Sequence, residues 1–176
     1  MLPGDLPLDE DLARIIRVNH AGEYGAKRIY DGQLAVLRHG AAHEAIAHMK
    51  AQEALHLSTF EQLMQQRRVR PTALMPLWHI GGFALGAVTA LMGEKAAMAC
   101  TVAVEEVIGA HYAAQEARLP DEEVALRDTV AQFRDDEQAH HDTGLAHGAE
   151  EAPLYRALYQ GVRSVTQAAI WLSTRI

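Results

Sequence analysis

The stretch Glu53-Ala54-Leu55-His56 recurs in this chain as Glu137-Gln138-Ala139-His140, and this repeat decides the fold. In each copy a glutamate lies three residues before a histidine. A further glutamate precedes each copy, because Glu23 lies 30 residues before Glu53 and Glu105 lies 32 residues before Glu137. The chain therefore contains two near-copies of one unit, each with two carboxylates and one imidazole.

The spacing inside each copy is typical of an α-helix, in which residues three or four apart share a face. The distance between the two glutamates of a unit suits two antiparallel helices joined by a short turn. Two such pairs predict a four-helix bundle whose core holds the ligand set of a carboxylate-bridged di-iron site. Four glutamates and two divalent ions form a neutral buried cluster, which avoids much of the cost of unpaired buried charge. Carboxylate and imidazole ligands without a thiolate favour iron or manganese over a structural zinc.

The second copy contains an additional histidine, His141, which lies four residues after Glu137 and is also near its face. The first copy decides between the two histidines. The position that matches His141 there is Leu57, which cannot bind a metal. His140 is therefore the predicted ligand.

Glu105 is followed directly by Glu106, so the upstream glutamate of the second unit is also ambiguous. Aligning the two units on Glu23 and Glu105 places a tyrosine seven residues later in both, whereas Glu106 breaks that match. Glu105 is therefore preferred. The tyrosines near these glutamates are interpreted as core aromatics rather than as contacts of the ligands; they are Tyr24, Tyr30 and Tyr112.

Pairs of the Glu-x-x-His type also arise by chance on exposed helices, because glutamate suits exposed positions. Two pairs, each with an upstream glutamate, favour the metal site over chance, and small residues such as Ala21, Gly22 and Gly25 flank the first of these glutamates. His43, Glu44 and His48 also resemble ligands, but Glu44 is about half a turn around the helix from Glu53. We expect these three residues to face solvent.

Glycine and proline divide the chain into long segments of helical periodicity, and almost nothing alternates as a strand does. The sequence predicts an all-α protein, a ferritin-like four-helix bundle with a long apolar crossover and an additional C-terminal amphipathic helix. The expected helices span residues 9–38, 42–66, 94–119, 121–147 and 153–176.

Length, charge and cysteine content exclude several classes of protein. A chain of 176 residues has the usual size of one domain, so a single domain is expected over residues 1–176. The formal net charge of −7 argues against nucleic acid as a partner. Cys100 is the only cysteine, which excludes an intramolecular disulfide. Residues 1–5 lack the basic and apolar regions of a signal peptide, so the cytosolic side is expected.

Residues 71–93 contain no Asp, Glu, Lys or Arg and directly follow three arginines. By length this segment could span a bilayer, but a single crossing would divide the six predicted ligands between two compartments. Its prolines, its glycines and His79 also make it a poor transmembrane helix. A segment that lies in the membrane surface is preferred to a crossover buried against the bundle.

The last expected helix, over residues 153–176, is basic and amphipathic. Apolar residues recur in it at helical spacing beside Arg156, Arg163 and Arg175, and no acidic residue follows Ala152. Both tryptophans of the chain, Trp78 and Trp171, fall in this helix or in residues 71–93, which suits anchoring at a membrane interface. We therefore expect the protein to bind a membrane surface.

Longer stretches carry a resemblance to a known family: residues 17–26 (RVNHAGEYGA), 68–72 (RVRPT), 75–78 (MPLW), 101–106 (TVAVEE), 133–137 (FRDDE) and 140–142 (HHD). Together they resemble the demethoxyubiquinone hydroxylases of ubiquinone biosynthesis. The resemblance covers the chain from about Arg14 to the C-terminus. Asn19 and Asp136 vary from the family, at positions outside the predicted ligands.

The resemblance implies a peripheral membrane monooxygenase that adds the last ring hydroxyl to a demethoxyubiquinol. Together with the cytosolic side expected from residues 1–5, it predicts a protein on the cytoplasmic face of the cell membrane. It implies two iron ions as cofactors, Fe²⁺ in the reduced state, and a polyprenylated quinol and dioxygen as substrates. The proposed redox and substrate-contact pair of the family falls on His111 and Tyr112. Its iron ligands fall on Glu23, Glu53, His56, Glu105, Glu137 and His140.

The residues alone leave alternatives open. A ferroxidase or a metal-binding and storage protein would use the same ligands without an apolar crossover. The chain has no Gly-rich dinucleotide fingerprint after a strand, so its sequence does not identify the electron donor. An amphipathic surface beside a membrane suits both a homo-oligomer and a lipid-binding partner protein, and composition does not separate the two.

Overall fold

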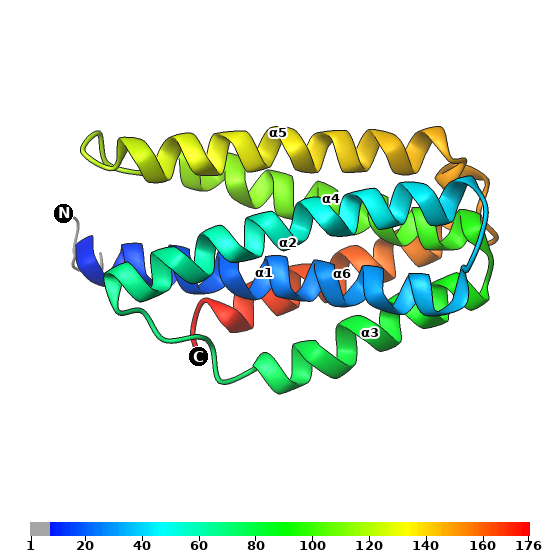
Figure 1. The fold of residues 1–176 in the computed structure, drawn as a ribbon, viewed down its shortest axis with the longest axis horizontal. Helices are drawn as coiled ribbons and strands as arrows, with labels where there is room; N and C mark the ends of the chain where they lie inside the picture. Colours follow the sequence, from blue (N-terminus) through cyan, green and yellow to red (C-terminus); the bar gives the residue numbers. More distant parts are fainter. Residues whose placement is uncertain (1–7) are drawn as a thin grey trace.

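The computed structural model describes residues 8–176, which form six α-helices and a short 3₁₀ turn, with no strand among them (Figure 1). Residues 1–5, in which the sequence shows no signal-peptide pattern, lie outside the described residues. The elements are α1 (Leu8–Val36), α2 (Ala41–Arg67), α3 (Met75–Leu91), α4 (Glu94–Glu116), α5 (Val124–Ala146), η1 (Ala149–Glu151) and α6 (Tyr155–Ser173). Each expected helix boundary lies within three residues of an observed one, and the all-α prediction is confirmed.

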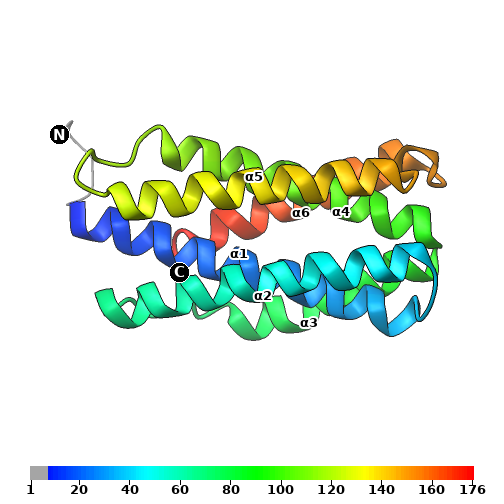
Figure 2. The same cartoon turned by 45° about the horizontal axis from the view of Figure 1, so that its top comes forward.

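The bundle consists of two antiparallel helix pairs. Helix α2 returns beside α1 after a short turn, and α5 returns beside α4 after residues 117–123 (Figures 1 and 2). Gly40 precedes α2 with a φ of 96°, a conformation that glycine adopts without steric cost. Pro120 follows α4 and cannot continue a helix. Each pair therefore contains one of the two repeated units.

Helix α4 lies at the centre of the molecule. Every residue from 96 to 105 is buried, because α1, α3, α5 and α6 all pack against this helix. The stretch is rich in small side chains such as Ala96, Ala97, Ala99 and Ala103, which allow neighbouring helices to approach closely. The buried carboxylate of Glu105 lies at the end of this stretch.

The apolar segment forms helix α3, which packs along α1 and carries exposed apolar side chains on its other side. The two backbones are in direct contact, since a Cβ atom added at Gly86 would overlap the carbonyl group of Ile29. Glycine at this position therefore sets the distance between α1 and α3. Within residues 8–176, no helix has both the length and the apolar character that crossing a membrane requires.

Candidate metal centre

All six ligands predicted from the sequence meet in the middle of the bundle, and each of their side chains is buried. They form two overlapping groups, and within each group one ligand atom per residue lies within 4.8 Å of the others. The first group is Glu23, Glu53, His56 and Glu137, and the second is Glu53, Glu105, Glu137 and His140. Glu53 and Glu137 belong to both groups, as carboxylates that bridge two ions would.

Several polar atoms of this cluster are buried and lack a hydrogen-bond partner among the described residues. They are Glu23 Oε2, both carboxylate oxygens of Glu53, Glu105 Oε2, Glu137 Oε1 and His56 Nδ1. Buried polar atoms are almost always satisfied in folded proteins, so a group of orphaned atoms that face one another needs a cation. Carboxylate oxygens and imidazole nitrogens without thiolate are ligands that suit iron or manganese. The chemistry of the donor set therefore fits a metal centre.

The charges in the cluster point to the same conclusion. Burial raises the pKa well above its ordinary value in three of the carboxyls, those of Glu23, Glu53 and Glu105. Burial would raise the pKa of Glu137 as well, but hydrogen bonds with His140 and His56 outweigh it and lower that pKa to about 2. The chain alone therefore resists four negative charges at once, and bound cations would relieve that repulsion.

Two tyrosines cross between the helix pairs and bond to the glutamates. Tyr30 on α1 donates a hydrogen bond of 2.5 Å to Glu105 Oε1, and Tyr112 on α4 donates one to Glu23 Oε1. The interpretation of these two tyrosines as core aromatics alone was incomplete, since both are buried but their hydroxyls contact the cluster. Tyr24 instead bonds to Nδ1 of His79 on α3, at 2.6 Å.

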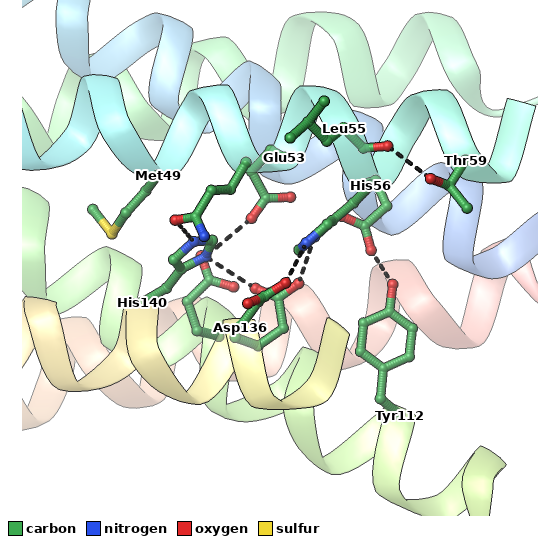
Figure 3. Close-up of polar contacts among 12 residues, drawn as sticks. Met49, Glu53, Leu55, His56, Thr59, Tyr112, Asp136 and His140 are labelled. Carbon is green, nitrogen blue, oxygen red and sulfur yellow. Dashed lines mark hydrogen bonds and ion pairs between the residues drawn. The ribbon is translucent and has the colours of Figure 1, made fainter. Parts of the chain in front are cut away.

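The imidazoles of the cluster point Nδ1 inward and Nε2 outward (Figure 3). The outward nitrogen of His56 lies 3.1 Å from Asp136 Oδ2, and that of His140 lies 3.1 Å from Gln52 Oε1. Sequence reasoning missed both partners, although each lies one residue before a ligand glutamate. The signal that could have found them is their shared position, four residues before the histidine of each unit.

The alternatives weighed from the sequence lie away from the cluster. His141 Nδ1 faces Asp142 Oδ1 at 3.1 Å, and Glu106 accepts a hydrogen bond from Tyr159 on α6. Glu44 and His48 are exposed, and His43 is half-buried with Nδ1 2.8 Å from the carbonyl oxygen of Leu37. Of the four residues at the two ambiguous positions, His140 and Glu105 therefore belong to the six convergent side chains, and His141 and Glu106 do not.

His111 and Tyr112 are adjacent in sequence but differ in their contacts. Tyr112 faces the cluster, whereas Nε2 of His111 lies 2.7 Å from the side-chain amide of Gln115. Gln115 also exchanges two hydrogen bonds of 2.8 Å with Asn19, so this amide is fixed in place. Burial and the nearby charge of Arg118 lower the pKa of His111 to about 4, which makes it a neutral imidazole at neutral pH.

Two cavities flank the cluster on different sides of the bundle. An apolar cavity of about 310 Å³ lies between α1, α3, α4 and α6, and its lining includes Ala21 and Gly22, the neighbours of Glu23. A polar groove of about 390 Å³ lies between α2 and α5, and its lining includes His56, Gln52 and Asp136. An apolar molecule and small polar species would therefore approach the cluster from different sides.

Comparison with known proteins gives consistent results. Residues 10–173 match the family described as ubiquinone biosynthesis protein COQ7. The chain is 52% identical over 176 residues to the 3-demethoxyubiquinol 3-hydroxylase of Rhodospirillum rubrum, covering 99% of this chain and 83% of that protein. It is 54% identical over 166 residues to the mouse NADPH-dependent 3-demethoxyubiquinone 3-hydroxylase, mitochondrial, covering 92% of this chain and 76% of the relative. The yeast 5-demethoxyubiquinone hydroxylase, mitochondrial, is 44% identical over 182 residues, which cover 94% of this chain and 78% of that protein.

Proposed function

Because the chain belongs to the family of the ubiquinone biosynthesis protein COQ7, we propose that it is a 3-demethoxyubiquinol 3-hydroxylase with a di-iron centre. The relatives with half of their residues identical are named for this reaction. The single observation that carries the di-iron assignment is the buried cluster of four glutamates and two histidines with orphaned ligand atoms. Glu23, Glu53, Glu105, Glu137, His56 and His140 would hold the two ions.

The reaction transfers one atom of dioxygen to a ring carbon and reduces the other to water, so it consumes two electrons and two protons from a donor. Two bound iron ions supply the redox chemistry that lets dioxygen react with the ring. The protein contributes the surroundings: it buries the ligands away from water, and Tyr30 and Tyr112 orient the two outer carboxylates. His111 is held as a neutral imidazole beside Tyr112, where the resemblance places redox and substrate contacts.

The quinol ring and its isoprenoid tail would occupy the apolar cavity. This cavity is lined almost entirely by apolar side chains of α1, α3, α4 and α6, and it reaches the residues beside Glu23. Such a lining suits a ligand whose only polar groups are on the ring. A ferroxidase or a metal-storage protein would need no apolar cavity beside its metal site, which favours the hydroxylase.

The mouth of this cavity would face a membrane. Exposed apolar side chains gather on α3 and α6, the two helices that line the cavity from outside; they are Leu77, Ile80, Val88, Leu91, Val165 and Trp171. An exposed apolar surface beside a site for a lipid-soluble substrate supports peripheral binding to the membrane surface. We propose that the protein takes its quinol directly from the bilayer.

Anaerobic reconstitution with Fe²⁺ tests the proposal. A short-tail demethoxyubiquinol, NADPH as electron donor and dioxygen are then added, and iron stoichiometry and product mass are read from the same sample. NADPH is the first donor to try because the mouse relative is named NADPH-dependent. Two irons per chain and a gain of one oxygen atom in the quinol are expected. Bound iron with no hydroxylated product under any donor would overturn the reaction, and no bound iron would overturn the metal centre.

A further inference from the structure

The two groups of ligands are matched in composition. Each group contains one imidazole and one glutamate of its own, and both share Glu53 and Glu137. Glu105 and Glu23, the glutamates that belong to one group only, each accept a hydrogen bond from a tyrosine hydroxyl of the other helix pair. Two ions bound by these groups would therefore have the same ligand types.

The outward hydrogen bonds of the imidazoles break this symmetry. His56 on α2 donates from Nε2 to the carboxylate of Asp136 on α5, and His140 on α5 donates from Nε2 to the amide oxygen of Gln52 on α2. Asp136 and Gln52 occupy the same position in the two units, four residues before the histidine. One position of the pair thus carries a charged acceptor and the other a neutral one.

The direction of each bond follows from the chemistry of the acceptor. An ionised carboxylate and an amide oxygen accept hydrogen bonds but cannot donate them, so Nε2 carries the proton in both imidazoles. Nδ1 points into the cluster, 3.4 Å from Glu23 Oε2 in His56 and 3.2 Å from Glu53 Oε1 and Glu137 Oε2 in His140, where a bound cation would replace any proton that Nδ1 shares with these carboxylates. Both imidazoles are oriented to bind a metal through Nδ1.

The environments of the two acceptors are otherwise similar. Both line the polar groove between α2 and α5, and the side chain of Asp136 is 31% exposed at its edge. The charge of Asp136 is therefore partly solvated, but its bond to His56 reaches a ring that is 3% exposed. The contrast between the two sides lies in the acceptor itself.

We propose that Asp136 and Gln52 are positioning residues that make the two metal positions inequivalent, with Asp136 giving the position at His56 the higher affinity for Fe²⁺. This inference rests on the proposed function, because it takes a di-iron centre as given. A carboxylate that accepts a hydrogen bond from the outer N–H of a ligand imidazole raises the basicity of that ligand. Removing such a partner typically lowers metal affinity by roughly 10-fold to 100-fold. An amide oxygen makes a weaker bond of the same geometry.

Titration of the iron-free full chain with Fe²⁺ under anaerobic conditions, in competition with a coloured chelator, tests the proposal. We expect two stepwise dissociation constants. The ratio between them should exceed the statistical ratio that two identical sites would give. Asp136→Asn should raise the lower constant by about 10-fold to 100-fold and leave the higher one in place. Gln52→Glu should lower the higher constant, because it supplies a charged acceptor to His140.

The matched control is Asp135→Asn, which removes the same charge one residue earlier on α5. The side chain of Asp135 is 74% exposed and is paired with Arg134, so neither constant should move beyond the effect of general charge. Helicity of each variant is checked first. If Asp136→Asn does not fold, the inference is tested by whether Gln52→Glu lowers the higher dissociation constant.

Equal constants in the unaltered chain would overturn the inference, as would an Asp136→Asn variant that shifts both constants alike or no more than Asp135→Asn does. Either result would leave the proposed hydroxylase intact, since both ions would still bind. A chain that binds no Fe²⁺ would overturn the di-iron centre and this inference with it.

Discussion

The hydroxyl of Tyr30 on α1 donates a hydrogen bond of 2.5 Å to Glu105 Oε1 on α4, and this bond joins the first helix pair to the second inside the buried cluster. Tyr112 on α4 makes the reciprocal bond to Glu23 on α1. Each tyrosine lies seven residues after the glutamate of its own unit but bonds to the glutamate of the other unit. The two helix pairs are thus held together by polar contacts at the same depth as the candidate ligands.

Replacing Tyr30 by phenylalanine should weaken the iron-free protein. The change removes the hydroxyl and leaves Glu105 Oε1 buried without its donor, which typically costs about 1–3 kcal/mol of unfolding free energy. Urea denaturation of both chains measures the loss. Tyr155→Phe is the control, because Tyr155 is half-buried at the start of α6 and packs against apolar side chains, and its hydroxyl makes no hydrogen bond with another described residue. An equal loss in both variants would contradict a specific role for the bond.

Gly86→Ala should separate α3 from α1. The new methyl group would overlap the carbonyl group of Ile29, and overpacking of this kind typically costs about 1–3 kcal/mol or more. The same substitution at Gly81 on the same helix meets no atom within 4 Å, so Gly81→Ala should be neutral or slightly stabilising. Thermal and urea unfolding should therefore show a loss of stability in Gly86→Ala and none in Gly81→Ala.

The helices and the convergence of the cluster could be predicted because they depend on local periodicity and spacing. The Glu-x-x-His pairs fix one helical face, and the distance to Glu23 or Glu105 fixes the partner helix. The choice between Glu105 and Glu106 followed from an internal repeat, which a single sequence can reveal. In the structure Glu105 is buried in the cluster, whereas Glu106 contacts α6.

The contacts that cross the bundle could not be predicted in the same way. Nothing in the local sequence around Tyr112 indicates that its hydroxyl reaches a helix 89 residues earlier in the chain. The bond between His56 and Asp136 spans 80 residues, and it depends on how α2 and α5 are rotated about their axes. Such rotations are set by packing of the whole bundle rather than by the periodicity of one helix.

Glu53→Ala should abolish hydroxylation and reduce iron content while leaving helicity in place. Glu53 belongs to both ligand groups, so its loss would affect both ions. Iron added to the unaltered chain should raise its melting temperature, because a ligand that binds only the folded state stabilises it, and this rise should be lost in the variant. Glu44→Ala, an exposed change on the same helix, should retain the full rise. Normal turnover by Glu53→Ala would contradict the assignment of Glu53 as a metal ligand.

The dependence of stability on pH should include a contribution from His111. Its pKa is lowered from 6.5 to about 4 by burial and by Arg118, so the unfolded chain binds this proton at a higher pH than the folded chain. Between these two values the unfolded state holds more protons, and stability falls as the pH decreases from 6.5 toward 4. In His111→Gln this fall is absent. Urea titrations at pH 7 and at pH 5 give the unfolding free energy of each chain. The value for the variant minus the value for the unaltered chain should be larger at pH 5 than at pH 7, and an equal difference at both pH values would contradict the prediction.

Binding to lipid vesicles should depend on the exposed apolar side chains of α3. Helix α3 lies on the side of the bundle away from α5 (Figure 1), and Ile80 on this helix is 69% exposed. Burying such a side chain in a membrane contributes about 1.5–3 kcal/mol, so Ile80→Asp should weaken partitioning into anionic vesicles by roughly 10-fold or more.

Val124→Asp is the matched control for Ile80→Asp. Val124 is 56% exposed at the start of α5 and lies across the bundle from α3, so the same type of substitution adds the same charge to a surface that is not expected to contact lipid. If general repulsion from anionic lipid explained the loss, both variants would weaken binding equally. Cosedimentation with vesicles of neutral and of anionic lipid separates the two effects: only insertion of α3 predicts that Ile80→Asp alone weakens binding to both kinds of vesicle.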